Sequence, residues 1–268
     1  MPPAPDRPRP LADLPERDAA AVRGVFTDID DTLTTDGAIT PDALRALQRL
    51  ADAGIPVVAI TGRPMGWSEP FARDWPVAAI VAENGAVALF REHGALQVEY
   101  AQDAATRARN ALRLQQAARL VLQEVPGATL ARDSAGRVTD IAIDHAEFAS
   151  LDDAQIARVV AVMRGQGMEA TVSSIHVNGW FGSHTKLSGA EWMLRRLFGR
   201  ALAAEADRWV YVGDSTNDQQ MFGHFPLSVG VANLRHFASQ LHTWPAYLAE
   251  GERGAGFSEV AQRLLGIR

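Results

Sequence analysis

The first third of the chain alternates between short apolar runs and segments in which apolar residues recur every three or four positions. The apolar runs have the length of buried strands and lie at residues 25–29, 55–60 and 77–82. Between the first two runs, Leu44, Leu47 and Leu50 have helical spacing, and a second helix is predicted at about residues 67–74. Strands that alternate with helices in this way predict a parallel sheet with right-handed crossovers.

The first of these helices has sequence signals at both ends. Thr40 is a suitable N-cap, and Pro41 follows it at the first helical position, where a missing N–H costs no hydrogen bond. Gly54 comes after the last apolar position and predicts the end of the helix.

The alternation of strands and helices stops at Glu83-Asn84-Gly85, in which Asn-Gly suits a positive-φ turn. The residues that follow are typical of hairpins and long helices rather than of strand–helix–strand units. We expect hairpins and strands at 86–101, 129–144 and 169–183, and helices at 104–125 and 152–165. The earlier alternation returns after Lys186.

This organisation divides the chain into three segments. Residues 23–84 and 184–268 are predicted to form an α/β core with a Rossmann-like parallel sheet, and residues 85–183 an inserted α+β domain. Residues 1–22 contain six of the 14 prolines, a density that opposes a packed element, so we expect a flexible tail there.

Composition narrows the range of partners and metal sites. A formal net charge of −6 argues against nucleic acid and membrane surfaces as partners. The absence of Cys excludes disulfides, thiolate metal sites and cysteine nucleophiles, and agrees with a cytoplasmic protein. The longest apolar stretches are of strand length, so no membrane-spanning helix is expected.

Acidic residues follow two of the predicted strands. Asp28 and Asp30 follow the first, and the carboxyl ends of strands line the ligand site in an open α/β sheet. One carboxylate there can attack phosphorus, and the other can protonate the leaving oxygen. Asp214 and Asp218 follow a later strand, although Ser215 and Asp218 also fit a helix-capping pattern. By itself, a pair such as Asp28 and Asp30 is more often an acidic loop end that caps the next helix or faces water.

Two further positions complete the pattern. Thr61 and Gly62 end the second strand and can donate to phosphate oxygens. Lys186 is the one Lys among 26 basic residues, and its compact ammonium differs from the wide guanidinium fork. Mg²⁺ prefers hard oxygen ligands, which Asp28 and Asp214 would supply. Together these residues predict a magnesium-dependent phosphoryl-transfer site.

The same residues resemble the haloacid dehalogenase superfamily of phosphohydrolases, from residue 25 onward. The insert resembles the C2B-type cap of subfamily IIB, which includes Cof-type, sucrose-phosphate, trehalose-phosphate and mannosyl-3-phosphoglycerate phosphatases. The resemblance implies the following roles: Asp28 as nucleophile, Asp30 as acid/base, Thr61, Gly62, Lys186 and Asn217 as phosphate-binding residues, and Asp28, Asp30, Asp214 and Asp218 around Mg²⁺. Asp31 departs from the family, which most often has Gly at that position.

The inserted domain is expected to choose the substrate. If the segment near residue 176 is a strand, His176, Asn178 and Trp180 share one face and could bind a sugar. An exposed hairpin in which Trp180 covers apolar surface is the alternative. We therefore predict a phosphatase that acts on small phosphorylated metabolites, with sugar phosphates as the expected substrates, and that forms an aspartyl-phosphate. A phosphosugar mutase and a catalytically inactive binding protein are the other interpretations.

Overall fold

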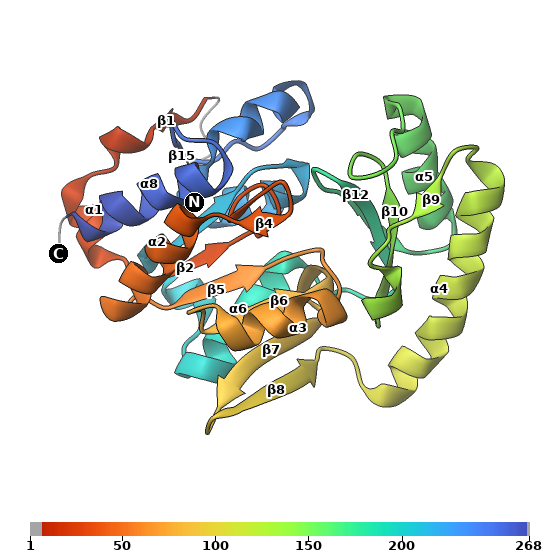
Figure 1. The fold of residues 1–268 in the computed structure, drawn as a ribbon, viewed down its shortest axis with the longest axis horizontal. Helices are drawn as coiled ribbons and strands as arrows, with labels where there is room; N and C mark the ends of the chain where they lie inside the picture. Colours follow the sequence, from red (N-terminus) through yellow and green to blue (C-terminus); the bar gives the residue numbers. More distant parts are fainter. Residues whose placement is uncertain (1–6, 267–268) are drawn as a thin grey trace.

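A mostly parallel sheet forms the centre of the larger part of the molecule (Figure 1). Within residues 7–266, which the computed structural model describes, this sheet has nine strands. In spatial order they are β1 (Arg9–Pro10), β15 (Tyr247–Leu248), β14 (Leu227–Gly230), β13 (Trp209–Gly213), β2 (Gly24–Thr27), β5 (Val57–Ile60), β6 (Ala79–Ala82), β7 (Val87–Glu92) and β8 (Ala95–Tyr100). Among the described strands of this sheet, only the pairings of β7 with β6 and with β8 are antiparallel, so the predicted α/β fold with a parallel sheet is confirmed.

Helices cover both faces of this sheet because successive strand residues point to opposite sides. Val25 lies in an apolar cluster with α2, α3 and α8, whereas Phe26 lies in a second cluster with α6 and α7. The helices are α1 (Glu16–Ala21), α2 (Pro41–Asp52), α3 (Met65–Asp74), α6 (Lys186–Phe198), α7 (Gln219–His224) and α8 (Arg253–Leu265). Within residues 7–266, none of the helices combines the length and the apolar character that a membrane span requires.

The inserted domain has a second sheet of four strands in the described part of the chain, in the order β11-β12-β10-β9. Its elements are α4 (Ala104–Glu124), β9 (Thr129–Leu130), β10 (Asp140–Asp144), α5 (Asp153–Gly165), β11 (Glu169–Val172) and β12 (His176–Trp180). Helices α4 and α5 pack on one face, where Ile143 and Val177 join their apolar cluster. The other face is turned towards the main sheet (Figure 1).

The first predicted hairpin belongs to the main sheet. β7 pairs antiparallel with β6 directly after a turn in which Gly85 has φ +108°. A side chain at Gly85 would meet the Thr185 carbonyl oxygen at 2.1 Å, so this close reversal requires glycine. The structure thus differs from the expected boundary at residue 85, because the chain enters the second sheet only after β8.

The N-terminal segment, for which a flexible tail was predicted, also differs from the prediction. Residues 1–6 lie outside the described residues, but the rest of the segment contains β1, a short 3₁₀ helix at Leu11–Asp13 and α1. The prediction was wrong here because proline is compatible with an edge strand and with the residue before a helix. Leu11 and Leu14 are buried in the main apolar cluster, and Arg263 of α8 donates a hydrogen bond to the Leu14 carbonyl.

The packing of this segment can be tested at Leu14, whose exposed fraction is only 2%. We expect Leu14→Ala to lower the free energy of unfolding by about 3 kcal/mol, because it leaves a cavity in the core. Leu112→Ala on α4 is the matched control, since Leu112 is 65% exposed and should cost less than about 0.5 kcal/mol. Equal values for the two variants in urea unfolding would show that the segment is detached.

Candidate active site

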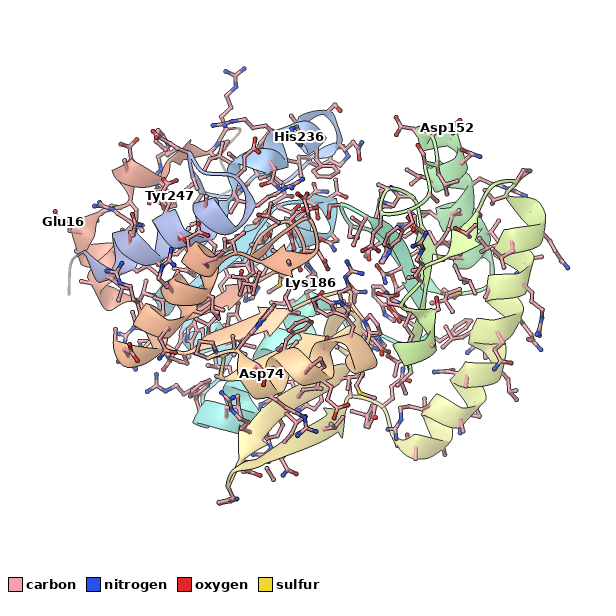
Figure 2. All side chains as sticks on the ribbon, viewed as in Figure 1. Glu16, Asp74, Asp152, Lys186, His236 and Tyr247 are labelled. Carbon is pink, nitrogen blue, oxygen red and sulfur yellow. The ribbon has the colours of Figure 1, made fainter. Side chains whose placement is uncertain are left out.

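Buried polar side chains gather at the carboxyl ends of neighbouring parallel strands. Asp28 follows β2, Thr61 follows β5, and Asp214 follows β13. Lys186 is the first residue of α6 and lies in the interior of the molecule (Figure 2). Because the order β13-β2-β5 places these ends side by side, residues almost 190 positions apart in sequence meet at one edge of the sheet.

Lys186 is the cationic centre of this group. Its Nζ lies 2.9 Å from Asp28 Oδ2 and 2.7 Å from Asp218 Oδ1, and it donates to Asn217 Oδ1 at 3.4 Å. The side chain is only 4% exposed. Burial opposes its charge, but the carboxylates of Asp218 and Asp28 outweigh this and hold the pKa of Lys186 above its usual range.

Asp218 is fully occupied by hydrogen-bond donors. One oxygen accepts from Lys186 and from the Tyr211 hydroxyl, and the other accepts the backbone N–H groups of Asp214 and Ser215 at 2.9 and 3.1 Å. A side chain at Gly213 would meet the Asp218 carboxylate at 2.5 Å, so glycine leaves room for it. These contacts make Asp218 an anchor for Lys186 and bear out the capping contact with Ser215.

Asp28 and Asp214 have fewer partners. Asp28 accepts the Ile29 N–H at 2.8 Å, and burial raises the pKa of Asp28 to about 7 although Lys186 opposes the shift. From the described residues, Asp214 accepts hydrogen bonds from the Thr32 hydroxyl and the Asn233 amide, both at 3.3 Å. Among residues 7–266 no basic side chain forms an ion pair with Asp214, and burial holds its pKa well above the ordinary range.

The three carboxylates fit a divalent cation. One oxygen from each of Asp28, Asp214 and Asp218 can be chosen so that all lie within 4.8 Å of one another. Lys186 supplies one positive charge to this group, and Asp214 is buried without an ionic partner in the described chain. Hard carboxylate oxygens are the ligands that Mg²⁺ prefers. The resemblance assigns only the backbone carbonyl of Asp30 to the metal, and its carboxylate, the predicted acid/base, is directed to Arg63.

Asp30 forms an ion pair with Arg63, a residue to which the sequence assigned no role. Arg63 Nε and Nη2 donate to both Asp30 oxygens at 2.9–3.1 Å. The same guanidinium reaches Glu147 at 2.8 Å and Asp133 at 3.3 Å, both in the inserted domain. Arg63, which is 5% exposed, therefore connects the predicted acid/base to that domain.

Glu147 is held in its charged form by this bridge. Its partial burial would raise its pKa, but hydrogen bonds from His176 and Arg63 outweigh this and lower the pKa of Glu147 to about 2. Arg63 stands two residues after Thr61, yet a sequence pattern does not say where its side chain points.

The loop at Thr61 and Gly62 contacts the inserted domain through its backbone. The Thr61 hydroxyl accepts the Arg63 N–H at 3.0 Å, and the Gly62 carbonyl accepts Arg137 at 2.9 Å and Asn178 at 3.2 Å. A side chain at Gly62 would meet Asn178 Oδ1 at 3.1 Å. Two polar side chains of the inserted domain thus hold the loop that was predicted to bind phosphate.

His176, Asn178 and Trp180 lie on the side of β12 opposite to the apolar cluster, and all three are buried. Trp180 donates to the His184 carbonyl at 3.0 Å, so the alternative of an exposed hairpin is wrong. His176 contacts Glu147 at 3.0 Å. Their polar groups are directed to protein partners, and a role for them in sugar binding stays a prediction.

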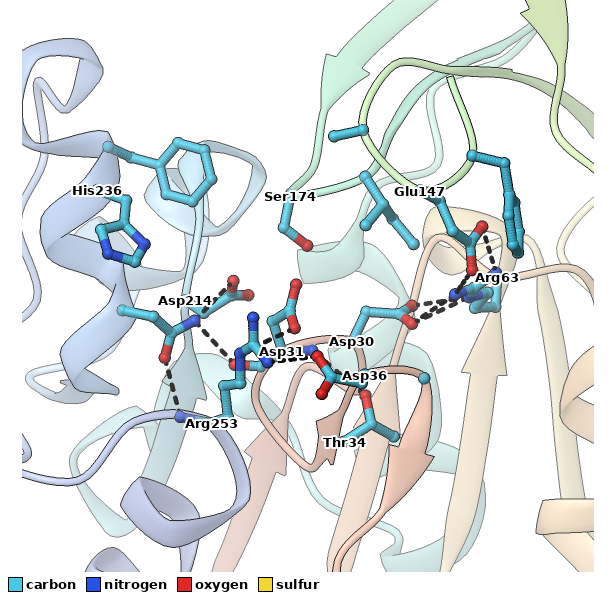
Figure 3. A pocket seen from close by; sticks show the side chains of 16 residues that line it. Asp30, Asp31, Thr34, Asp36, Arg63, Glu147, Ser174, Asp214, His236 and Arg253 are labelled. Atoms are coloured by element: carbon cyan, nitrogen blue, oxygen red, sulfur yellow. Dashed lines mark hydrogen bonds and ion pairs between the residues drawn. The ribbon is translucent and has the colours of Figure 1, made fainter. Parts of the chain in front are cut away.

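A cavity of about 490 Å³ opens between the two domains (Figure 3). The strand-end site contributes Asp30 and Asp214, while the inserted domain contributes Glu147 and Ser174. Other lining residues include Asp31, Asp36, Asn233, His236 and Arg253. Asn233 follows β14, so the rule that located Asp214 could have found it too.

Known proteins resemble this chain in sequence over part of its length and in fold. Residues 25–136 match the family model of haloacid dehalogenase-like hydrolases. A search among curated proteins finds no match to the sequence. The structure is similar to that of a Thermoplasma acidophilum protein, with a TM-score of 0.71 and 14% identity, covering 92% of this chain and 99% of the other.

Two structures with named activities have the same fold. The C-terminal domain of C. albicans trehalose-6-phosphate phosphatase has a TM-score of 0.68 and 14% identity, covering 97% of this chain and 99% of its own. The sucrose-phosphatase from Synechocystis, solved with sucrose and phosphate, has a TM-score of 0.65 and 16% identity, covering 91% and 98%. At these identities the likeness concerns the fold.

The contact between Trp180 and His184 has a consequence for pH dependence. The two rings stack with centroids 5.5 Å apart, and burial lowers the pKa of His184 from 6.5 to about 4. Between these values the unfolded chain binds a proton at His184 that the folded chain does not, so the free energy of unfolding falls as the pH is lowered.

In the wild type, the free energy of unfolding should change with pH between about 4 and 6.5. We expect His184→Gln to reduce the slope of this change by up to about 1.4 kcal/mol per pH unit. Urea unfolding at several pH values within the window measures it, and His242→Gln, at an exposed histidine, is the control. A slope that is the same in His184→Gln as in the wild type would contradict the assignment.

Proposed function

We propose that this chain, whose residues 25–136 match the model of the haloacid dehalogenase-like hydrolases, hydrolyses phosphate monoesters of small metabolites at the strand-end site. The contact of Lys186 with both Asp28 and Asp218 carries the proposal, because it places a buried cation beside a buried carboxylate nucleophile. An anionic ester needs such a cation to approach an anionic nucleophile.

Asp28 is the proposed nucleophile. Its carboxylate oxygen forms a bond to phosphorus as the bond from phosphorus to the ester oxygen breaks, which gives an aspartyl-phosphate. Lys186, the Thr61 hydroxyl and the Gly62 N–H would bind the phosphoryl oxygens. Asn217 lies at 3.4 Å from Lys186 and orients its ammonium.

Asp30 is the proposed acid/base. It lines the cavity where the departing alcohol would lie, and it would protonate the ester oxygen and later accept a proton from the attacking water. Arg63 holds both Asp30 oxygens, so the proton can be carried only when this ion pair loosens. Contacts of Arg63 with Glu147 make that event depend on the position of the inserted domain.

We propose Mg²⁺ as the cofactor, held by Asp28, by Asp214 and by the Asp30 backbone carbonyl, with Asp218 beside it. When bound, the ion would neutralise charge that develops on the phosphoryl oxygens. Asp214, buried and without an ionic partner in the described chain, would gain that partner.

Sugar phosphates are the proposed substrates. Two proteins of similar fold are named as sucrose- and trehalose-6-phosphate phosphatases, and the cavity between the domains has room for a small polar molecule. The inserted domain lines this cavity through Glu147 and Ser174, which can bind hydroxyl groups.

Release of inorganic phosphate tests the activity. With a panel of phosphosugars and p-nitrophenyl phosphate, we expect release in the presence of Mg²⁺, loss of release with a chelator, and at least about a thousandfold loss in Asp28→Asn, because the amide is no nucleophile. Transfer of phosphate to a second sugar hydroxyl without release would identify a mutase. No turnover of any ester would contradict the proposal and favour an inactive binding protein.

The Lys186 pocket gives a second prediction. Lys186→Arg keeps the charge, but the wide guanidinium does not fit between Asp28 and Asp218 at 2.9 and 2.7 Å, so we expect kcat to fall about a hundredfold. Arg196→Lys is the control, since Arg196 pairs with Glu92 on the surface hairpin β7–β8 and should not affect kcat. Near-normal turnover of Lys186→Arg would rule out a pocket that requires a compact charge.

A further inference from the structure

The cavity between the domains is acidic. Among the described residues that line it, five carboxylates outnumber two guanidinium groups. The carboxylates belong to Asp30, Asp31, Asp36, Glu147 and Asp214. Arg63 is already paired with Asp30 and Glu147, which leaves Arg253 as the other guanidinium of the described lining that could meet an anion on a substrate; the imidazole of His236 also lines the cavity.

Arg253 is neutralised by two acidic residues of the segment between β2 and α2 (Figure 3). Its Nε lies 3.3 Å from Asp31 Oδ1, and its Nη1 lies 2.8 Å from Asp36 Oδ1. The Asp36 side chain is 86% exposed, so water screens its attraction, whereas Asp31 is largely buried. Ser174 of the inserted domain lines the same cavity as Asp31.

The backbone fixes the pair of Asp31 and Arg253. Both residues have φ +53°, in the left-handed region that most residues avoid. Asn233 links them, because its Nδ2 donates to the Asp31 carbonyl at 3.0 Å and its Oδ1 accepts the Arg253 N–H at 2.9 Å. Such backbone conformations persist only where the surroundings hold them, so the two side chains face each other by construction.

We propose that Asp31 is a specificity-determining residue that restricts the enzyme to phosphate monoesters whose alcohol carries no second negative charge. By pairing with Arg253, Asp31 occupies the cation that could bind a carboxylate or a second phosphate. With both guanidinium groups of the described lining already paired, a second anion finds no free guanidinium there, whereas the carboxylate oxygens can still accept hydrogen bonds from neutral hydroxyls. This inference rests on the proposed phosphatase activity and narrows its substrates to neutral polyol and sugar monophosphates.

The test compares two esters of nearly the same shape. Glycerol 3-phosphate releases a neutral alcohol, whereas 3-phosphoglycerate releases one with a carboxylate in place of a CH₂OH group. The readout is the ratio of kcat/KM for 3-phosphoglycerate to kcat/KM for glycerol 3-phosphate, measured for each variant with Mg²⁺. General losses of activity cancel in this ratio.

We expect the wild-type ratio to be below one and Asp31→Asn to raise it about tenfold or more, since a freed guanidinium can bind the carboxylate. Asn keeps the shape of Asp and tolerates the left-handed conformation, so this variant should fold. Asp36→Asn, the matched control on the exposed partner, should change the ratio less than about threefold. Adding Arg253→Gln to Asp31→Asn should return the ratio towards the wild-type value.

A wild-type preference for 3-phosphoglycerate, or an unchanged ratio in Asp31→Asn, would overturn the inference while leaving the phosphatase intact. Persistence of the raised ratio in the double variant would also overturn it, because Arg253 would then not be the responsible cation. If the wild type fails to hydrolyse even p-nitrophenyl phosphate with Mg²⁺, the proposed function itself fails, and the inference fails with it.

Discussion

The structure depends on the buried ammonium group of Lys186, whose single positive charge lies among more carboxylates than it can neutralise. Lys186 lies between Asp28 and Asp218, while Asp214 is buried beside them without an ionic partner in the described chain. Like charges gathered in a low-dielectric interior are costly unless a cation or directed donors compensate them. The fold supplies such donors to Asp218 through Tyr211 and two backbone amides. The remaining deficit at Asp214 is what makes the site suitable for a divalent cation.

A second constraint acts between the domains, where polar contacts replace apolar packing. The Gly62 carbonyl accepts two side chains of the inserted domain, and Arg63 binds carboxylates on both sides. Buried Glu83 accepts the backbone N–H groups of residues 138 and 139 in the same way. Polar interfaces of this kind permit relative motion more readily than an apolar core does. The inserted domain therefore meets the main domain at the cavity through directed polar contacts.

Local sequence signals located most elements correctly, and the misses have physical reasons. Thr40, Pro41 and Gly54 bound α2 as predicted, with Gly54 at φ +72°. The hairpin β7–β8 was found as a hairpin, but its assignment to the main sheet depends on pairing with β6, which no local pattern specifies. The N-terminal segment was judged by its prolines, although Leu11 and Leu14 contribute to the core. A high density of prolines shows only that few backbone N–H groups in the segment can donate hydrogen bonds. Whether the segment is buried depends on the residues that pack against it.

The sequence by itself determined the alternation of strands and helices, the acidic residues at strand ends and the isolated Lys186, because each is a property of neighbouring positions or of composition. From these, the parallel sheet and the strand-end site follow by topology. Only the tertiary structure decided that Arg63 reaches Asp30 and Glu147, that Arg253 faces Asp31, and that Asn178 and Arg137 bind the Gly62 carbonyl across the two domains. These contacts join residues far apart in the chain, and the direction of a side chain depends on the packing around it rather than on its sequence neighbours.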